Sequence, residues 1–316
     1  MHGRILVLFP GSLGDFLCFL PALRFIYTAN PETTVEIVAR GDGLLLAQRF
    51  REIARVLSLE SSTFAKLFSS PPSLNAEEMK FFTSADAILS WFGHDRLRIS
   101  EVLPQAGKGQ VRSFAFFTGQ EDCHATAYYL RCVGADTLCC PSFGLKPEEK
   151  QWLDGYWQQC GWNPESRLLI LHPGSGGKKK RWAPEGFAHV AQWWKARRNS
   201  QIVILLGPAE EQERESWRLV GKVESTLSLG QAAALLGRAE VYVGNDSGVS
   251  HLAGAVGARG VVLFGPTRPQ QWRPLGGALS PLQNVAYRRK RPDVVGITLE
   301  EIAAEEVIAA LIRLGV

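Results

Sequence analysis

Short aliphatic runs alternate with stretches of helical periodicity in the first half of the chain. Buried strands are predicted at 4–9, 35–39, 87–91 and 113–117. Helices are predicted at 16–27, 95–103 and 121–133. Residues 60–75, rich in Ser and Pro, are typical of a loop. The chain therefore opens as a βαβ unit.

The same alternation restarts in the second half. Strands are predicted at 168–172, 201–206, 240–243 and 260–264. Helices are predicted at 184–197, 209–220 and 247–256. Strands separated by helices of this length indicate a parallel sheet covered on both faces. The fold class is therefore α/β, with two doubly wound, Rossmann-like domains facing a central cleft where functional residues follow the strands.

Length and composition agree with two soluble domains. A chain of 316 residues exceeds the usual size of one hydrophobic core. A Pro- and Gly-containing stretch at 141–166 marks the junction, which gives domains at 1–150 and 151–316. Asp15 interrupts the apolar start of the chain, which argues against a signal peptide or membrane anchor. Six cysteines without Cys-x-x-Cys spacing favour reduced thiols in a cytoplasmic protein.

Charge separates the two halves. Residues 1–160 hold 15 Lys and Arg against 17 Asp and Glu, a net charge of −2. Residues 161–316 hold the remaining 20 against 14, a net charge of +6. An anionic ligand is therefore expected in the second half, although scattered solvated lysines would give the same count. The basic residues lack interleaved aromatics and any nucleic-acid motif, so no nucleic-acid partner is expected.

The first candidate for chemistry is Gly11-Ser12-Leu13-Gly14-Asp15, at the turn between the first strand and its helix. Glycines let a backbone approach a ligand closely. Ser12 and Gly14 of this loop are the candidate acceptor-side residues. A carboxylate at Asp15 could accept a proton from a sugar hydroxyl. The alternative is that Asp15 only caps the helix.

The second candidate is the glycine-rich loop from His172 to Gly177, followed by Lys178-Lys179-Lys180-Arg181-Trp182. Cations and backbone amides between a strand and a helix suit a diphosphate. The spacing matches neither a P-loop nor a dinucleotide fingerprint, which argues against a nicotinamide oxidoreductase. The alternative is a basic surface turn.

The third candidate is the run from Val243 to His251, which contains Gly244-Asn245-Asp246-Ser247-Gly248. Asp246 is predicted as a helix N-cap, which leaves the amides of Ser247 and Gly248 for phosphate or ribose oxygens. His251 lies one turn further along the same face. A lone His is otherwise more often structural.

Together these motifs resemble glycosyltransferase family 9, the ADP-heptose:lipopolysaccharide heptosyltransferases. The segments Pro21-Ala22-Leu23, His251-Leu252-Ala253 and Phe264-Gly265-Pro266-Thr267 add to the resemblance. The resemblance implies a GT-B fold, an N-terminal acceptor domain, and a C-terminal domain that holds a nucleotide-diphosphate sugar. It also implies an inverting, metal-independent transfer without a cofactor.

The resemblance assigns roles by position. Asp15 matches the general base and Lys180 the lysine that contacts phosphate. The donor-binding set comprises Ser175, Lys180, Glu210, Asp246, Ser247, Gly248 and His251. Glu210 resembles a ribose contact, with Glu211 as the alternative register.

The resemblance therefore implies a glycosyltransferase that moves a sugar, with heptose the first choice, to a glycan or lipopolysaccharide inner-core acceptor. Its partners would be a nucleotide sugar and a glycan or glycolipid, and peripheral contact with the cytoplasmic face of the inner membrane stays open. Two alternatives remain: another GT-B enzyme such as a sugar-nucleotide epimerase, and a catalytically silent nucleotide-sugar-binding protein.

Overall fold

The computed structural model describes residues 3–67, 69, 71–92, 110–119, 122–283 and 299–316. The chain forms two compact units, Met1–Cys139 and Cys140–Val316. The boundary precedes helix α7 (Pro147–Gln159), which packs against α10 (Leu229–Arg238) of the second unit. The Pro- and Gly-containing stretch thus includes a helix that belongs to the C-terminal fold.

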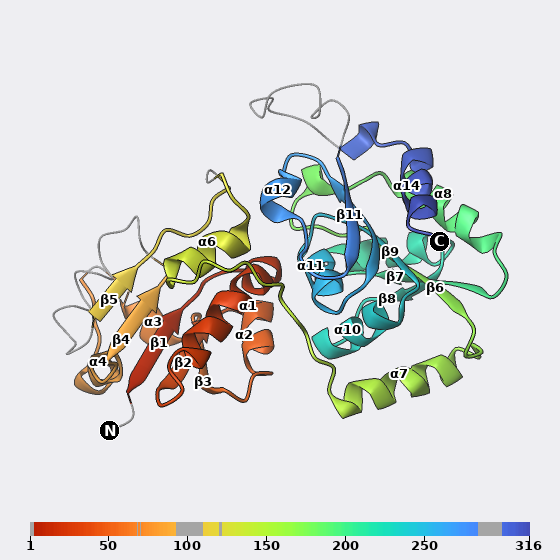
Figure 1. Cartoon of the computed structure of the whole chain (residues 1–316). Coiled ribbons are helices and arrows are strands. Elements are labelled where there is room, and N and C mark those ends of the chain that lie inside the picture. Colours follow the sequence, from red (N-terminus) through yellow and green to blue (C-terminus); the bar gives the residue numbers. More distant parts are fainter. Residues whose placement is uncertain (1–2, 68, 70, 93–109, 120–121, 284–298) are drawn as a thin grey trace. The chain divides into compact units, whose positions relative to one another are not determined.

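The first unit is a five-stranded parallel sheet (Figure 1) in the order β3-β2-β1-β4-β5. Its strands are β1 (Arg4–Leu8), β2 (Thr34–Ala39), β3 (Ile53–Ser58), β4 (Ala87–Ser90) and β5 (Gln110–Ser113). Its helices are α1 (Leu13–Thr28), α2 (Gly41–Ala47), α3 (Ser62–Leu67), α4 (Ala76–Thr83) and α6 (Ala125–Cys132). All its paired strands are parallel.

Alternate side chains of β1 build two different layers in this unit. Leu6 and Leu8 join a core with Phe64 of α3 and Phe82 of α4. Just past the strand, the Phe9 ring stacks on Phe19 of α1 at 4.1 Å and meets Tyr129 of α6 at 5.3 Å. Successive residues of a strand point to opposite faces, so this buried strand requires helices on both sides.

The second unit has six parallel strands in the order β11-β10-β9-β6-β7-β8. They are β6 (Arg167–His172), β7 (Ser200–Leu205), β8 (Lys222–Glu224), β9 (Val241–Asn245), β10 (Arg259–Phe264) and β11 (Ala278–Gln283). The α-helices are α7, α8 (Pro184–Lys195), α9 (Arg214–Trp217), α10, α11 (Gly248–Ala255), α12 (Pro269–Trp272) and α14 (Ala304–Arg313). Short 3₁₀ helices are η1 (Lys178–Lys180), η2 (Pro208–Glu213) and η3 (Leu299–Glu301).

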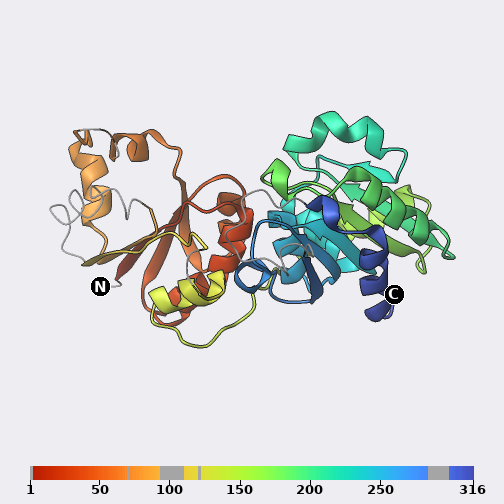
Figure 2. The ribbon, with the colours of Figure 1, turned by 90° about the horizontal axis from the view of Figure 1, so that it is seen from above.

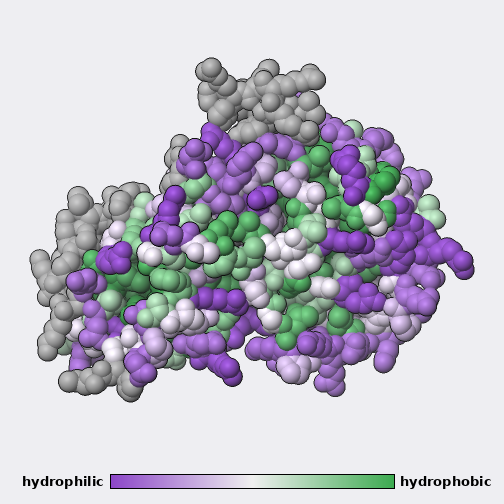
Figure 3. All heavy atoms as spheres, viewed as in Figure 1, coloured by the Kyte–Doolittle hydropathy of each residue, from purple (hydrophilic) through white to green (hydrophobic). Residues whose placement is uncertain are grey.

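Helices enclose this sheet from both sides (Figure 2). On one face, Phe187 and Trp194 of α8 and Leu311 of α14 share a core with alternate strand residues. The other face carries α10 and α11, which contact each other. Hydrophilic residues make up most of the outer edge of this unit in the view of Figure 3, as helices that bury one side require. No helix among the described residues is long and apolar enough to cross a membrane.

Both sheets reverse their winding direction at one point. In the first unit the chain leaves β1 for β2 on one side and returns to β4 on the other. In the second unit β6 leads outward to β7 and β8, and β9 then pairs with β6 on its other side. Ligands of such sheets bind at the carboxyl ends of the strands beside the reversal. The loops after β1, β6 and β9 lie at these places.

Most predicted strands and helices are confirmed, with four exceptions. The strand at 113–117 is wrong, because β5 ends at Ser113 and the aromatic residues after it pack on Trp91, Phe9 and Tyr129. The loop at 60–75 contains α3. The helix at 209–220 is divided into η2 and α9. The helix at 95–103 lies outside the described residues.

One glycine of β10 makes a testable close approach. Gly260 pairs with Tyr242, and an added Cβ would lie 1.8 Å from the Tyr242 carbonyl oxygen. Gly260→Ala should therefore lower the free energy of unfolding by about 3 kcal/mol or more. Gly257, with φ of +83° and open space around its Cβ position, is the matched control. Gly257→Ala should cost only ~1–2 kcal/mol of conformational strain.

Urea unfolding of the two variants measures both costs. Equal losses for Gly260→Ala and Gly257→Ala would mean that the sheet relaxes around the new methyl group.

Candidate functional site

In the first unit the predicted residues form the start of α1. Ser12 is the N-cap of this helix, and Asp15 is its third residue. Oδ2 of Asp15 accepts hydrogen bonds from Ser12 N at 3.0 Å and from Ser12 Oγ at 2.7 Å. The alternative role of Asp15 is thus refined: Asp15 is not the N-cap but bonds to the N-cap residue. Gly14 is buried and Asp15 is half-buried.

Tight packing fixes the loop before Asp15. A Cβ at Gly11 would lie 2.4 Å from the Phe9 ring and 2.6 Å from Cβ of Asp15. Tyr129 lies nearby in the aromatic layer, and burial, assisted by the negative charge of Asp15, raises its pKa above the usual range. Tyr129 therefore keeps its proton near neutral pH.

In the second unit the three loops after β6, β9 and β10 meet at one carboxylate. Oδ2 of Asp246 accepts hydrogen bonds from Lys180 Nζ at 2.8 Å and from Thr267 Oγ1 at 2.6 Å. Ser175 Oγ donates to the backbone oxygen of Asp246 at 2.8 Å. The Asp246 side chain is 6% exposed and that of Lys180 35%. Lys180 is thus anchored on a buried carboxylate while about a third of its own side chain stays exposed.

Asn245, which precedes this carboxylate, is fully buried and connects the loop after β6 to β9. Its Nδ2 donates to the carbonyl of Pro173 at 2.7 Å, and its Oδ1 accepts from the amide of Trp182 at 3.1 Å. One amide side chain therefore holds both ends of the lysine-bearing loop. Asn245 belongs to the third predicted motif, but its bridging contacts were not predictable from the sequence.

The start of α11 differs from its prediction. Ser247, not Asp246, is the N-cap, and Ser247 Oγ accepts from Ser250 N at 3.3 Å. The Asp246 side chain is instead occupied by Lys180 and Thr267. Gly248 begins the helix, and His251 is 4% exposed on its first turn. The first amides of a helix have no intrahelical acceptor, so the amide of Gly248 can serve an anion.

Glu210 lies after β7, with 4% of its surface exposed. Its carboxylate forms an ion pair with Arg181 and accepts from the amide of Gly207 at 3.0 Å. A Cβ at Gly174 would lie 2.7 Å from Glu210, so Glu210 borders the glycine-rich loop. Glu211 instead pairs with Arg214 at the surface. The geometry therefore favours Glu210 over Glu211 as the residue facing this loop.

His172 contributes no positive charge to the cluster. Its Nδ1 lies 2.9 Å from the carbonyl of Leu205, and burial lowers its pKa below the usual range. The imidazole is therefore neutral at neutral pH. Arg181 is committed to Glu210 and Glu213, whereas Lys180 bonds Asp246, the residue just before the N-cap of α11.

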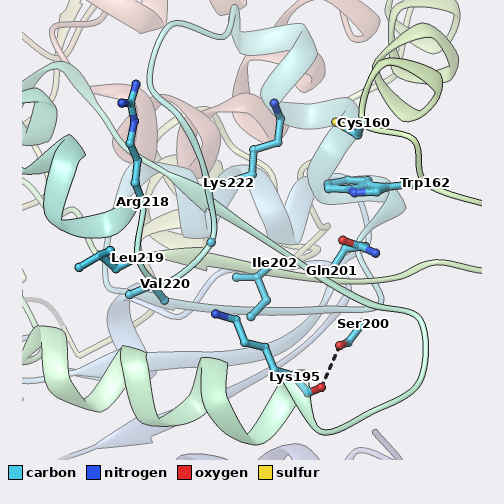
Figure 4. A pocket seen from close by; sticks show the side chains of 11 residues that line it. Cys160, Trp162, Lys195, Ser200, Gln201, Ile202, Arg218, Leu219, Val220 and Lys222 are labelled. Carbon is cyan, nitrogen blue, oxygen red and sulfur yellow. Dashed lines mark hydrogen bonds between the residues drawn. The ribbon is translucent and has the colours of Figure 1, made fainter.

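A cavity of about 390 Å³ lies elsewhere in this unit (Figure 4). Lys195, Ile202, Arg218 and Lys222 are among its lining residues. Ile202 and Lys222 belong to the amino-terminal parts of β7 and β8, so the cavity lies at the sheet edge opposite the motif loops. It contains none of the predicted site residues.

The pattern of glycosyltransferase family 9 (heptosyltransferase) matches residues 137–295, half of the chain. The chain belongs to this family. Its sequence is 23% identical to lipopolysaccharide heptosyltransferase 2 of Escherichia coli (strain K12) over 310 residues, which covers 86% of this chain and 85% of the relative.

Two solved structures show the same fold. The glycosyl transferase family 9 protein of Veillonella parvula DSM 2008 has a TM-score of 0.78 at 19% identity and covers 99% of this chain and 97% of its own. E. coli heptosyltransferase WaaC with ADP-2-deoxy-2-fluoro heptose has a TM-score of 0.66 at 17% identity, and the alignment covers 99% of this chain and 100% of the WaaC chain. The predicted GT-B fold and the predicted class, a glycosyltransferase, are confirmed.

Thr267 is, after Asn245, a second residue of the site whose role was not predicted from the sequence. Its motif contributed to the family resemblance, yet no role was given to its hydroxyl. The available signal was its place just after β10, next to β9 in the sheet.

Proposed function

We propose that this family 9 enzyme transfers a heptose, with inversion, from an ADP-heptose-like donor to a hydroxyl of a lipopolysaccharide inner-core acceptor. The observation that carries the proposal is Lys180, held by the buried Asp246 carboxylate beside the first amides of α11. Family membership and the relatives support the same reading. One relative is a lipopolysaccharide heptosyltransferase, and another was solved with an ADP-heptose analogue.

The second unit supplies the leaving-group chemistry. Cleavage of a glycosyl-diphosphate bond places negative charge on the departing phosphate while the sugar becomes oxocarbenium-like. The Lys180 ammonium has three donors, of which one bonds Asp246, so two remain for phosphate oxygens. The start of α11 adds amides and the positive end of the helix dipole. Groups positioned in this way before the reaction stabilise the transition state by several kcal/mol.

The first unit supplies the base. Oδ2 of Asp15 accepts both hydrogen bonds from Ser12, so Oδ1 is the oxygen that would accept the proton of the acceptor hydroxyl. These bonds fix the carboxylate before the acceptor arrives, and a positioned base lowers the cost of the proton transfer. The glycolipid acceptor would bring the enzyme into peripheral contact with the cytoplasmic face of the inner membrane.

Transfer is tested by incubating the enzyme with ADP-heptose and a heptose-free inner-core lipopolysaccharide. We expect ADP release that depends on the acceptor, a heptosylated product by mass spectrometry, and thermal stabilisation by ADP-heptose. Conversion of the nucleotide sugar without acceptor would indicate an epimerase instead. Stabilisation without any turnover would indicate a silent binding protein.

The proposal also predicts that transfer needs no metal ion. Lys180 and the helix amides would offset the charge that a metal offsets in other transferases. Among the described residues, no group of three or more His, Cys, Asp or Glu is placed to hold a metal ion. The transfer rate should therefore stay within about twofold of its untreated value in excess EDTA. A rate that falls with EDTA and returns with magnesium or manganese would contradict this chemistry.

A further inference from the structure

Three loops of the second unit converge on one oxygen atom. Lys180 follows β6, Asp246 follows β9 and Thr267 follows β10, and these strands are neighbours in the sheet. Lys180 Nζ and Thr267 Oγ1 both donate to Oδ2 of Asp246, at 2.8 and 2.6 Å. The carboxylate that anchors the lysine is thus itself held by a hydroxyl from a third loop.

The backbone of Asp246 is fixed as well. Its amide donates to the carbonyl of Leu263 at 3.0 Å, and its carbonyl accepts from Ser175 Oγ. With the backbone fixed, the remaining freedom is rotation of the carboxylate, which the Thr267 bond removes. Lysine carries a flexible four-carbon stem and loses much rotamer entropy when it is immobilised. A rigid anchor immobilises the lysine before the donor reacts, so less rotamer entropy is lost when the transition state forms.

We propose that Thr267 is a positioning residue for the transfer. It orients the Asp246 carboxylate, which places the Lys180 ammonium where the leaving diphosphate develops its charge. The inference rests on the proposed function and adds to it a residue that acts through two others. Thr267 itself does not bind the diphosphate in this arrangement.

Hydrogen-bond chemistry separates this role from a direct contact. A threonine hydroxyl has one proton, and here that proton is donated to Asp246. Phosphate oxygens of the donor accept hydrogen bonds and have no proton to give at neutral pH. A direct bond from Thr267 to the diphosphate would therefore require it to release Asp246. The side chain can serve one of the two roles at a time.

The test combines three substitutions at Thr267 with one at Lys180. Thr267→Val removes the donor at nearly constant shape, Thr267→Ser keeps it, and Thr267→Ala removes it with a smaller side chain. We expect the single-turnover rate with ADP-heptose to fall ~10-fold in Thr267→Val and Thr267→Ala, and to recover in Thr267→Ser. In a Lys180→Ala background, Thr267→Val should cause no further loss, because a residue that acts through the lysine has nothing left to position.

Calorimetry with ADP and thermal unfolding complete the experiment. Melting temperatures near that of the wild type show that the variants are folded, and Thr267→Ala serves if the Val variant fails to fold. Losses that multiply in the double variant, or a Thr267→Val rate equal to the wild-type rate, would overturn the positioning role alone. A wild-type protein that neither binds ADP nor transfers heptose would overturn the proposed function and this inference with it.

Discussion

Asp15→Asn should lower the transfer rate at least ~100-fold while the melting temperature and the affinity for the donor stay at their wild-type values. The amide oxygen of Asn can accept the bonds that Oδ2 of Asp15 receives from Ser12, so the start of α1 keeps its geometry. At this third position of the helix, Asn loses only the favourable interaction of the carboxylate with the helix dipole, about 0.3–1 kcal/mol, which changes the melting temperature little. What the variant loses is the ability to take a proton from the acceptor hydroxyl.

The measurement is a single-turnover transfer assay beside thermal unfolding with and without donor. Asp42→Asn is the matched control, because Asp42 is an exposed acid in the first turn of α2. It should keep both rate and stability. An Asp15→Asn enzyme that transfers at nearly the wild-type rate would remove the general-base role. A variant that unfolds while the Asp42→Asn control stays folded would leave Asp15 with a structural role only.

The parallel strands at the centre of each sheet were predictable, because burial on both faces produces unbroken aliphatic runs such as Leu168 to Leu171. Edge strands carry no such run. The edge strand β3 has an exposed Ala54 and Arg55, and β11 contains Pro281 and has exposed or half-buried residues throughout. A proline within a short run argues against a strand, and here it is tolerated because β11 lies at the sheet edge.

The sequence was sufficient to predict which loops form the site, but not which of their residues contact one another. Glycine-rich and polar segments after strands indicated which loops carry chemistry, and these segments supply Lys180, Asp246 and Ser175 to one cluster. Which of two adjacent capping residues begins a helix depends on tertiary partners. Asp246 and Ser247 are equally good N-caps, and the lysine and threonine that occupy Asp246 leave the cap to Ser247.

Lys180→Ala should weaken the affinity for ADP and ADP-heptose by ~10- to 100-fold, since a hydrogen bond to a charged group contributes about 1.5–3 kcal/mol. The transfer rate should fall further, because the charge that the lysine meets grows as the phosphate leaves. Lys179→Ala is the matched control: its side chain is exposed in the same 3₁₀ turn, and η1 keeps the same backbone. That control should stay within about twofold of the wild type.

A second variant separates the two causes that could weaken binding. Lys180→Ala leaves the buried Asp246 carboxylate without its cation, and that charge would repel a diphosphate even if Lys180 never touched it. The double variant Lys180→Ala with Asp246→Asn removes the repulsion. If Lys180 contacts the donor, removing the repulsion recovers only part of the loss, and calorimetry with ADP should find the double variant still well below wild-type affinity. If the double variant regains wild-type affinity, the lysine serves only to neutralise Asp246, and the leaving-group role assigned to it is wrong.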